Sequence, residues 1–114
     1  MEVHPGVFVS RTDTEDWRFD PEVGGEMHVL VEAEGGYAGM SRFVIDPGPE
    51  AWMLPEREVL IVLEGAAHID IEGGPTLDLE VGDMASIPKG AVTSWRLDLP
   101  YKEMWFFARP YEIT

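Results

Sequence analysis

The sequence contains no cysteine, which excludes disulfide bonds and thiolate chemistry. Basic residues are also scarce: 8 lysines and arginines stand against 22 acidic residues, so the net charge is −14. Because nucleic acids and anionic membrane surfaces bind basic faces, we expect neither as a partner. No apolar run approaches the roughly 20 residues of a transmembrane helix, and the N-terminus does not resemble a signal peptide. We therefore expect a cytoplasmic protein.

The sequence also lacks a helical pattern of useful length. Its 114 residues, 45% of them hydrophobic, are enough for one domain with an ordinary core. Twelve glycines and nine prolines are scattered along the chain, and they separate short runs in which apolar and polar residues alternate. Roughly eight to ten such strands at near-regular spacing predict an all-β sandwich or barrel.

The chain divides into an N-terminal segment and a barrel that together form one domain. Residues 1–26 predict an edge strand followed by an acidic arm, and residues 27–114 predict the barrel itself. Residues 27–33 and 37–46 alternate between apolar and polar positions and predict a hairpin. His28 falls on the more polar face of the first of these strands, which favours a surface or interface histidine.

The rest of the chain is organised around the stretch from Glu58 to Trp95. It opens with an apolar strand, and Gly65 is expected to turn the chain where that strand ends. It closes with a Gly-Asp turn at 82–83, a short apolar strand and a Pro-Lys-Gly turn at 88–90. The other strands are expected to pair and pack around these two parts of the stretch.

Two of the predicted strands are apolar on both faces. They are residues 59–63 and residues 101–108. Such a strand has to be covered on both sides, and in a small sheet protein only one side can meet the core. An uncovered apolar face would be an aggregation hazard. We therefore predict a homodimer in which a second copy covers the other face.

These motifs resemble those of the cupin superfamily. The spacing from Glu58 to Gly65 resembles the end of the first cupin motif, and the pattern at 82–90 resembles the start of the second. The similarity covers about residues 38–109 and is greatest to the small cupins grouped with the ureidoglycine aminohydrolase cupin domain. The resemblance implies the cupin fold, a double-stranded β-helix or jelly-roll barrel in a single domain. Cupins include many enzymes and binding proteins, so the resemblance is weakly specific for function.

Cupins usually hold a divalent metal through three histidines and a glutamate, and the resemblance places Glu58 at the glutamate position. The three histidine positions are occupied by Trp52, Leu54 and Thr93, or by Ala51 and Met53 in place of the first two with one residue more of spacing. One carboxylate does not make a metal site. We therefore predict no metal ligands and expect no cofactor. The alternative is manganese, zinc, iron or nickel at an atypical site.

The three histidines do not form a ligand pair in the sequence, because none has His-x-His spacing. His4 lies near the N-terminus and is expected to be solvated. His68 is out of phase with Ile69 and Ile71, so it should point away from the core. A metal site rebuilt from these histidines and Glu58 is the weaker alternative.

Glu58 is the candidate catalytic residue. It is in phase with Leu60 and Val62, so it should face the barrel interior. Burial would raise the pKa of its carboxyl group and suit it to general acid or base catalysis. The alternative is a remnant of a metal-binding ancestor, paired in a salt bridge with Arg57, Arg42 or Arg96. The candidate ligand-binding residues at the barrel mouth are Trp52, Leu54, Glu58, Thr93, Trp95 and Met40, for each of which simple core packing is the alternative.

Three functions follow as hypotheses. The first is a cupin that binds a small molecule inside the barrel without the usual metal site. The second is a cupin enzyme acting on a small polar or nitrogenous metabolite; the resemblance implies an aminohydrolase-like reaction with a divalent metal, and Glu58 as acid or base is the metal-free form. The third is a non-catalytic dimeric interaction protein whose barrel is packed shut. An open polar cavity around Glu58 would separate the first two from the third.

Overall fold

The computed structural model describes residues 1–33, 35–48 and 50–108. Within them the chain is all β, and no helix is present that could cross a membrane. The strands are β1 (Glu2–His4), β2 (Val7–Phe8), β3 (Arg18–Phe19), β4 (Glu26–Ala33), β5 (Gly36–Phe43), β6 (Trp52–Met53), β7 (Glu58–Ile71), β8 (Thr76–Glu80), β9 (Met84–Ile87) and β10 (Val92–Ala108). All but β1 and β2 belong to one antiparallel sheet, which confirms the predicted fold class.

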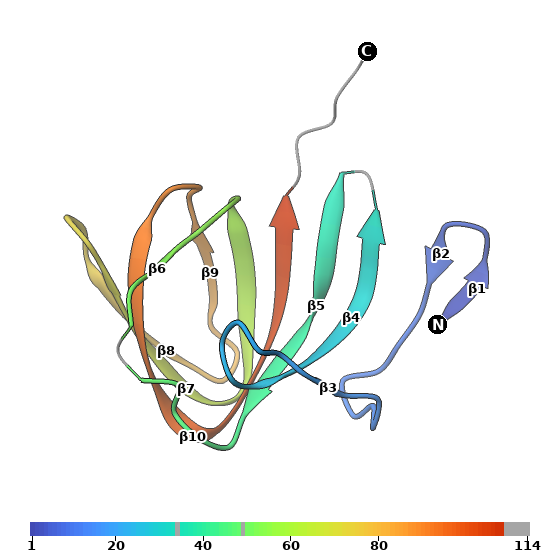
Figure 1. The fold of residues 1–114 in the computed structure, drawn as a ribbon, viewed down its shortest axis with the longest axis horizontal. Helices are drawn as coiled ribbons and strands as arrows, with labels where there is room; N and C mark the ends of the chain where they lie inside the picture. The colour runs from blue at the N-terminus through green and yellow to red at the C-terminus, as the bar shows by residue number, and fades with distance from the viewer. Residues whose placement is uncertain (34, 49, 109–114) are drawn as a thin grey trace, which may run out of the picture.

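The two longest strands, β7 and β10, run side by side and bend together, so the sheet folds into the U seen in Figure 1. On one side of the bend the order is β3-β4-β5-β10-β7, with β9 on the first half of β7. On the other side β8 pairs with the second half of β7, and β6 pairs with the start of β10. The two sides face each other across the barrel interior.

The chain turn predicted at Gly65 is wrong, because β7 continues through this residue for 14 residues in all. Gly65 has a φ of +75°, which a glycine adopts at little cost. The register of β10 shifts between Asp98 and Lys102, opposite Gly65. Both strands therefore bend at one place, and their hydrogen bonds resume on either side of the irregularity. The two short strands expected on each side of Gly65 form one bent strand.

The core draws buried side chains from both sides of the bend. Leu60 and Val62 alternate inward from the first half of β7, and Ala67 and Ile69 from its second half. Leu97, Tyr101 and Trp105 of β10 and Phe43 of β5 pack against them in one apolar cluster. This cluster does not fill the open end of the U.

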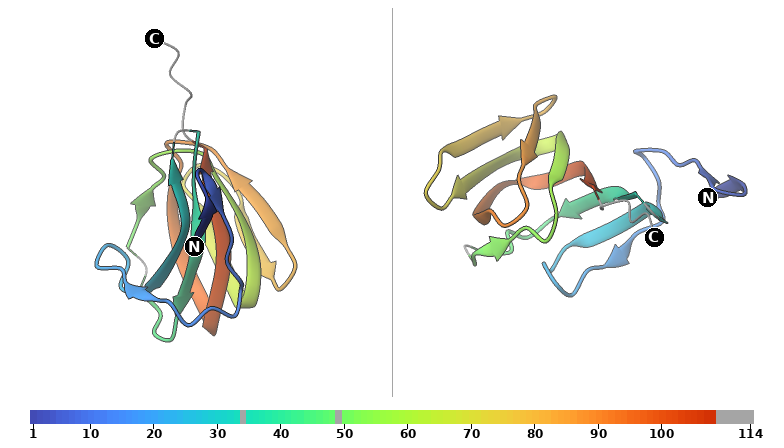
Figure 2. Two further views of the ribbon diagram at one scale, coloured as in Figure 1. Left: turned by 90° about the vertical axis from the view of Figure 1, so that its right-hand side faces the viewer. Right: turned by 90° about the horizontal axis from the view of Figure 1, so that it is seen from above.

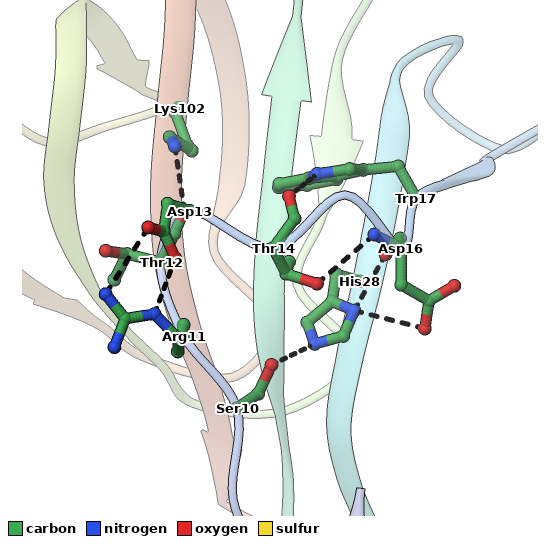
Figure 3. Close-up of polar contacts among 9 residues, drawn as sticks. All are labelled: Ser10, Arg11, Thr12, Asp13, Thr14, Asp16, Trp17, His28 and Lys102. Atoms are coloured by element: carbon green, nitrogen blue, oxygen red, sulfur yellow. Dashed lines mark hydrogen bonds and ion pairs between the residues drawn. The ribbon is translucent and has the colours of Figure 1, made fainter.

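His28 is buried, so its placement at the surface was wrong. Only 7% of His28 is exposed, because residues 10–17 run across the outer side of β4 and β5 and cover it (Figure 3). Its Nδ1 lies 2.8 Å from the Asp16 carbonyl oxygen and its Nε2 lies 2.7 Å from Ser10 Oγ. Since a carbonyl only accepts, Nδ1–H donates to Asp16 and Nε2 accepts from Ser10. Both ring nitrogens are therefore used to attach this segment.

Further contacts attach the same segment to the sheet. Lys102 Nζ of β10 donates to the carbonyl oxygen of Thr12 at 2.9 Å. The Arg42 guanidinium of β5 lies 4.2 Å from the Trp17 ring centre, in a cation–π arrangement. The hairpin β1–β2 that precedes this segment forms a two-stranded sheet of its own and stands beside the barrel in Figures 1 and 2. The N-terminal edge strand thus pairs within this hairpin and not with the barrel.

The outer side of β7 and β10 is apolar and partly exposed. Val59 pairs with Phe106, and Ile61 pairs with Met104, on adjacent positions of the two strands. Val59, Met104 and Phe106 each retain between 37% and 40% of their surface in the single chain. The apolar face on which the dimer was predicted is therefore real, and the homodimer itself stays a prediction.

Candidate functional site

A cavity of about 890 Å³ opens between the two sides of the U. Its walls come from the inner face of β4, β5, β7 and β10 and from the segments before β4 and around β6. The barrel is therefore not packed shut, which removes the structural basis of the third hypothesis as stated. A space of this size suits a small organic molecule, whose usual pockets run from roughly 300 to 1,000 Å³.

Two carboxyl groups face this cavity from neighbouring strands. Glu58 comes from β7, and Glu103 comes from β10. Glu58 pairs with Phe107 and Glu103 pairs with Val62, so the Leu60–Trp105 pair lies between them on the ladder. Only 4% of Glu58 and 5% of Glu103 are exposed. The inward direction of Glu58 agrees with its predicted phase.

Neither acid has a cationic partner among the described residues. The arginines that could have paired with Glu58 lie elsewhere: Arg42 Nε lies 3.0 Å from Glu26 Oε1, and Arg57 donates to Ser86 Oγ at 2.8 Å. Arg96 occupies an exposed position of β10, opposite His68. Glu58 Oε1 is buried and has no hydrogen-bond partner in the described part of the chain. The salt-bridged remnant offered as the alternative for Glu58 is therefore not what the structure shows.

The shared burial of the two acids governs their protonation. Burial raises the pKa of Glu58 to about 9, and the negative charge of Glu103 adds to the rise. Burial also raises the pKa of Glu103 to about 7, against the opposing effect of the nearby Tyr101 hydroxyl. The two groups titrate as a pair. Near neutral pH they hold at least one proton between them, so one can donate a hydrogen bond while the other accepts.

Aromatic side chains line the cavity beside the two acids. Tyr37 and Trp105 lie edge to face at 4.8 Å between ring centres, and Trp105 and Phe107 lie at 5.5 Å. Trp52 meets Phe107 edge to face at 6.3 Å, which extends the cluster towards β6. The Trp105 indole donates to Ser41 Oγ at 2.8 Å, so the ring is held in one orientation. The wall is apolar and fixed before any ligand arrives.

The structure brings together only part of the predicted ligand-binding set. Glu58, Trp52 and Trp95 line the cavity. Leu54 does not, because it is 1% exposed and packs in the core, and Met40 does not, because it lies on the opposite face of β5. Those two assignments of position were wrong: Leu54 is held by backbone bonds to residues 90 and 91, and Met40 follows the alternation of its strand to the outside.

Thr93 also lies behind the cavity and not in its lining. It is fully buried, donates from Oγ1 to the Trp52 carbonyl oxygen at 2.9 Å, and accepts from the Trp95 indole at 2.9 Å. It therefore positions the two tryptophans that do line the cavity. The position where cupins usually carry a histidine ligand here supports an aromatic wall.

Glu103 is the site residue that the sequence analysis missed. It lies within 101–108, which reads as an aromatic strand apolar on both faces and so gives no reason to single out one acid. The signal that could have found it is its position in the alternation: Glu103 lies on the same face of the strand as Tyr101, Trp105 and Phe107. A carboxylate in phase with three aromatic residues predicts a buried acid.

The residues present do not fit the metal that cupins usually hold. In the described ranges no group of three or more histidine, aspartate or glutamate side chains is placed to bind an ion. Glu58 and Glu103 supply two carboxylates, and their neighbours on the cavity wall are aromatic. The nearest histidines serve elsewhere: the His28 side chain lies on the outer face of β4, where it bonds Ser10 and Asp16, and His68 lies on the surface between Asp78 and Asp98, which raise its pKa. The chemistry available to this site is therefore that of its two carboxyl groups.

Comparison with known proteins places this geometry in a family. Residues 32–105 match the EutQ-like cupin domain. The chain belongs to the EutQ-like cupin domain family. The matched range contains β5 to β9, both buried acids and most of β10, whereas the part of the cavity lining that comes from residues 20–27 precedes it. The cupin prediction made from the motifs is thereby confirmed.

Solved structures of low sequence identity share the fold of this cupin. An RmlC-like cupin from Shewanella frigidimarina matches with a TM-score of 0.70 and 17% identity, over 90% of this chain and 91% of its own. KdgF from Halomonas sp. matches with a TM-score of 0.68 and 20% identity, over 90% and 94%. The DMSP lyase DddQ from Ruegeria pomeroyi matches with a TM-score of 0.64 and 19% identity, over 87% and 58%. No curated protein matches the chain in sequence.

Proposed function

We propose that this cupin binds a small organic molecule in its barrel, without the metal site usual in the superfamily. The observation that carries the proposal is the cavity of about 890 Å³ with two buried carboxyl groups directed into it. A buried polar atom without a partner costs free energy, on the order of 1–3 kcal/mol. Glu58 Oε1 is such an atom, and a ligand that reaches it would recover part of this cost on binding.

A variant that fills the cavity mouth tests the proposal. Ala51→Trp adds a bulky side chain at the lining, whereas Val81→Trp adds the same side chain at an exposed position outside the cavity. In a thermal-shift screen of metabolites with EDTA present, we expect ligands that stabilise the wild type by mass action. Ala51→Trp should lose this stabilisation, and Val81→Trp should keep it. Absence of any stabilising ligand, or equal stabilisation of both variants, would contradict a binding function for this cavity.

A second function, catalysis, is favoured by the unequal pKa values of the paired acids. Near neutral pH Glu58 would remain protonated while Glu103 is partly ionised, and acids separated in this way suit a general acid and a general base. Hydrolysis of a nitrogenous metabolite, as the resemblance to ureidoglycine aminohydrolase cupins implies, would use Glu103 to accept a proton from water and Glu58 to donate one to the leaving nitrogen.

Glu58→Gln separates catalysis from binding. The amide keeps the size of the side chain and cannot donate an acidic proton, so turnover of any substrate found in the screen should fall by about 100-fold or more. The affinity for a neutral ligand should change much less. Unchanged turnover in the variant would exclude Glu58 as the acid, and an absence of turnover for every bound ligand would leave a binding protein.

A further inference from the structure

The charged side chains that line the cavity all have one sign. Among the described lining residues there is no lysine, arginine or histidine. Six are acidic, two of them buried at the floor and four on the rim: Glu58, Glu103, Asp20, Glu22, Glu50 and Glu56. An apolar cavity with charge of one sign attracts ions of the opposite sign and repels like ones. Binding of anionic metabolites is therefore disfavoured both at the rim and at the floor of the cavity.

The floor of the cavity contains an acceptor that the protein leaves unsatisfied. Glu58 is more than nine-tenths buried, lines the cavity, and has one carboxyl oxygen without a hydrogen-bond partner in the described residues. This oxygen can accept a hydrogen bond from a donor, and a donor that carries positive charge also offsets the buried negative charge of the ionised Glu103. A ligand with charged N–H groups meets both needs at once.

The aromatic wall is suited to the same kind of ligand. Tyr37, Trp105, Phe107 and Trp52 form one continuous cluster, and all four line the cavity. Aromatic faces attract cations, most strongly when water is excluded, and they also pack against apolar groups. A ligand with a cationic head and an apolar body would therefore match both the floor and the wall.

We propose that this cavity binds an organic cation with N–H donors, namely a primary ammonium, amidinium or guanidinium group on an apolar body. Glu58 and Glu103 bind the charged head, and the aromatic wall surrounds the body. The inference rests on the proposed binding function and adds the chemical class of the ligand to it.

A charge series of one molecular shape tests the class. We would measure binding of 2-phenylethylamine, 2-phenylethanol and phenylacetate to the full chain by calorimetry with EDTA present. The pH would be 8, above the pKa of about 7 of Glu103, so that the acid pair is charged. We expect the amine to bind at least about tenfold more tightly than the alcohol, and phenylacetate not to bind.

Variants assign the effect to the acid pair. Glu103→Gln removes the acid that is ionised at pH 8, so it should weaken binding of the amine by about tenfold or more and reduce the preference for the amine over the alcohol. Glu58→Gln should weaken binding of the amine by less, because Glu58 keeps its proton up to a pKa of about 9. Glu64→Gln removes an acid from an exposed position of the same strand and should keep the preference for the amine. The comparison within the wild type stands even if one cavity variant fails to fold.

The outcomes separate the ligand class from the binding function. Equal binding of the alcohol, or any tighter binding of phenylacetate, would overturn the cation proposal and leave a small-molecule cavity. The cation proposal would also be overturned if the amine does not bind while neutral ligands from the screen bind and Ala51→Trp blocks them. If no ligand of any charge binds in the cavity, both the class and the proposed function are wrong.

Discussion

Glu58→Gln is expected to stabilise the ligand-free protein relative to the wild type by about 4 kcal/mol more at pH 8 than at pH 5. The folded wild type keeps the Glu58 proton up to a pKa of about 9, whereas an unfolded glutamate loses it near 4.5. Between these values the folded state binds more protons than the unfolded state, so the free energy of unfolding falls as the pH rises. Glutamine has no proton to lose, and the variant should lack this decline.

Urea denaturation followed by tryptophan fluorescence at pH 5, 6.5 and 8 would measure the effect. Glu64→Gln is the matched control, because it removes one acid from an exposed position of the same strand. If the free energy of unfolding changes with pH in the same way in both variants, that dependence reflects the net charge of −14 and not the burial of Glu58. Parallel pH curves for the wild type and Glu58→Gln would show that Glu58 is ionised in the folded protein and would contradict a protonated Glu58 near neutral pH.

Gly65→Ala is expected to destabilise the protein by about 3 kcal/mol or more. The residue has a φ of +75°, which already disfavours a Cβ atom. A Cβ there would also overlap the carbonyl oxygens of Asp98 and Pro100 in the facing strand and lie 3.2 Å from Tyr101 Cα. These are backbone atoms at the shared bend of β7 and β10, so they cannot move away without disturbing the pairing of the two strands.

Gly73→Ala isolates the contribution of the close contact. Gly73 has almost the same φ, +73°, and a Cβ built there meets nothing within 4 Å. Its replacement should cost only about 1 kcal/mol, which is the backbone term alone. Chemical denaturation of both variants gives the difference directly. Equal losses of stability would mean that the bend yields easily and that Gly65 matters only for its φ angle.

The alternation of apolar and polar residues predicted the direction of a side chain correctly where that direction depends on a single strand. Glu58 shares its phase with Leu60 and Val62, so its inward direction followed from a period of two. The turns predicted at Gly82 and Gly90 need glycine at positive φ, and both residues have it. The resemblance of their spacing to the second cupin motif is what implied the cupin fold. The same logic failed at Gly65, since a positive φ can bend a strand as well as end it, and only the facing bulge in β10 decides which.

The sequence by itself determined the all-β cupin fold, the inward carboxyl of Glu58 and the absence of the usual histidine ligands, because each depends on local alternation or motif spacing. Tertiary structure decided the rest of the site. The register of β7 on β10 placed Glu103 near Glu58, although the two acids are distant in the chain, and residues 10–17 buried His28. Thr93 came to support Trp52 and Trp95 through contacts between strands. Pairing between distant strands sets which side chains meet, and no local pattern encodes that register.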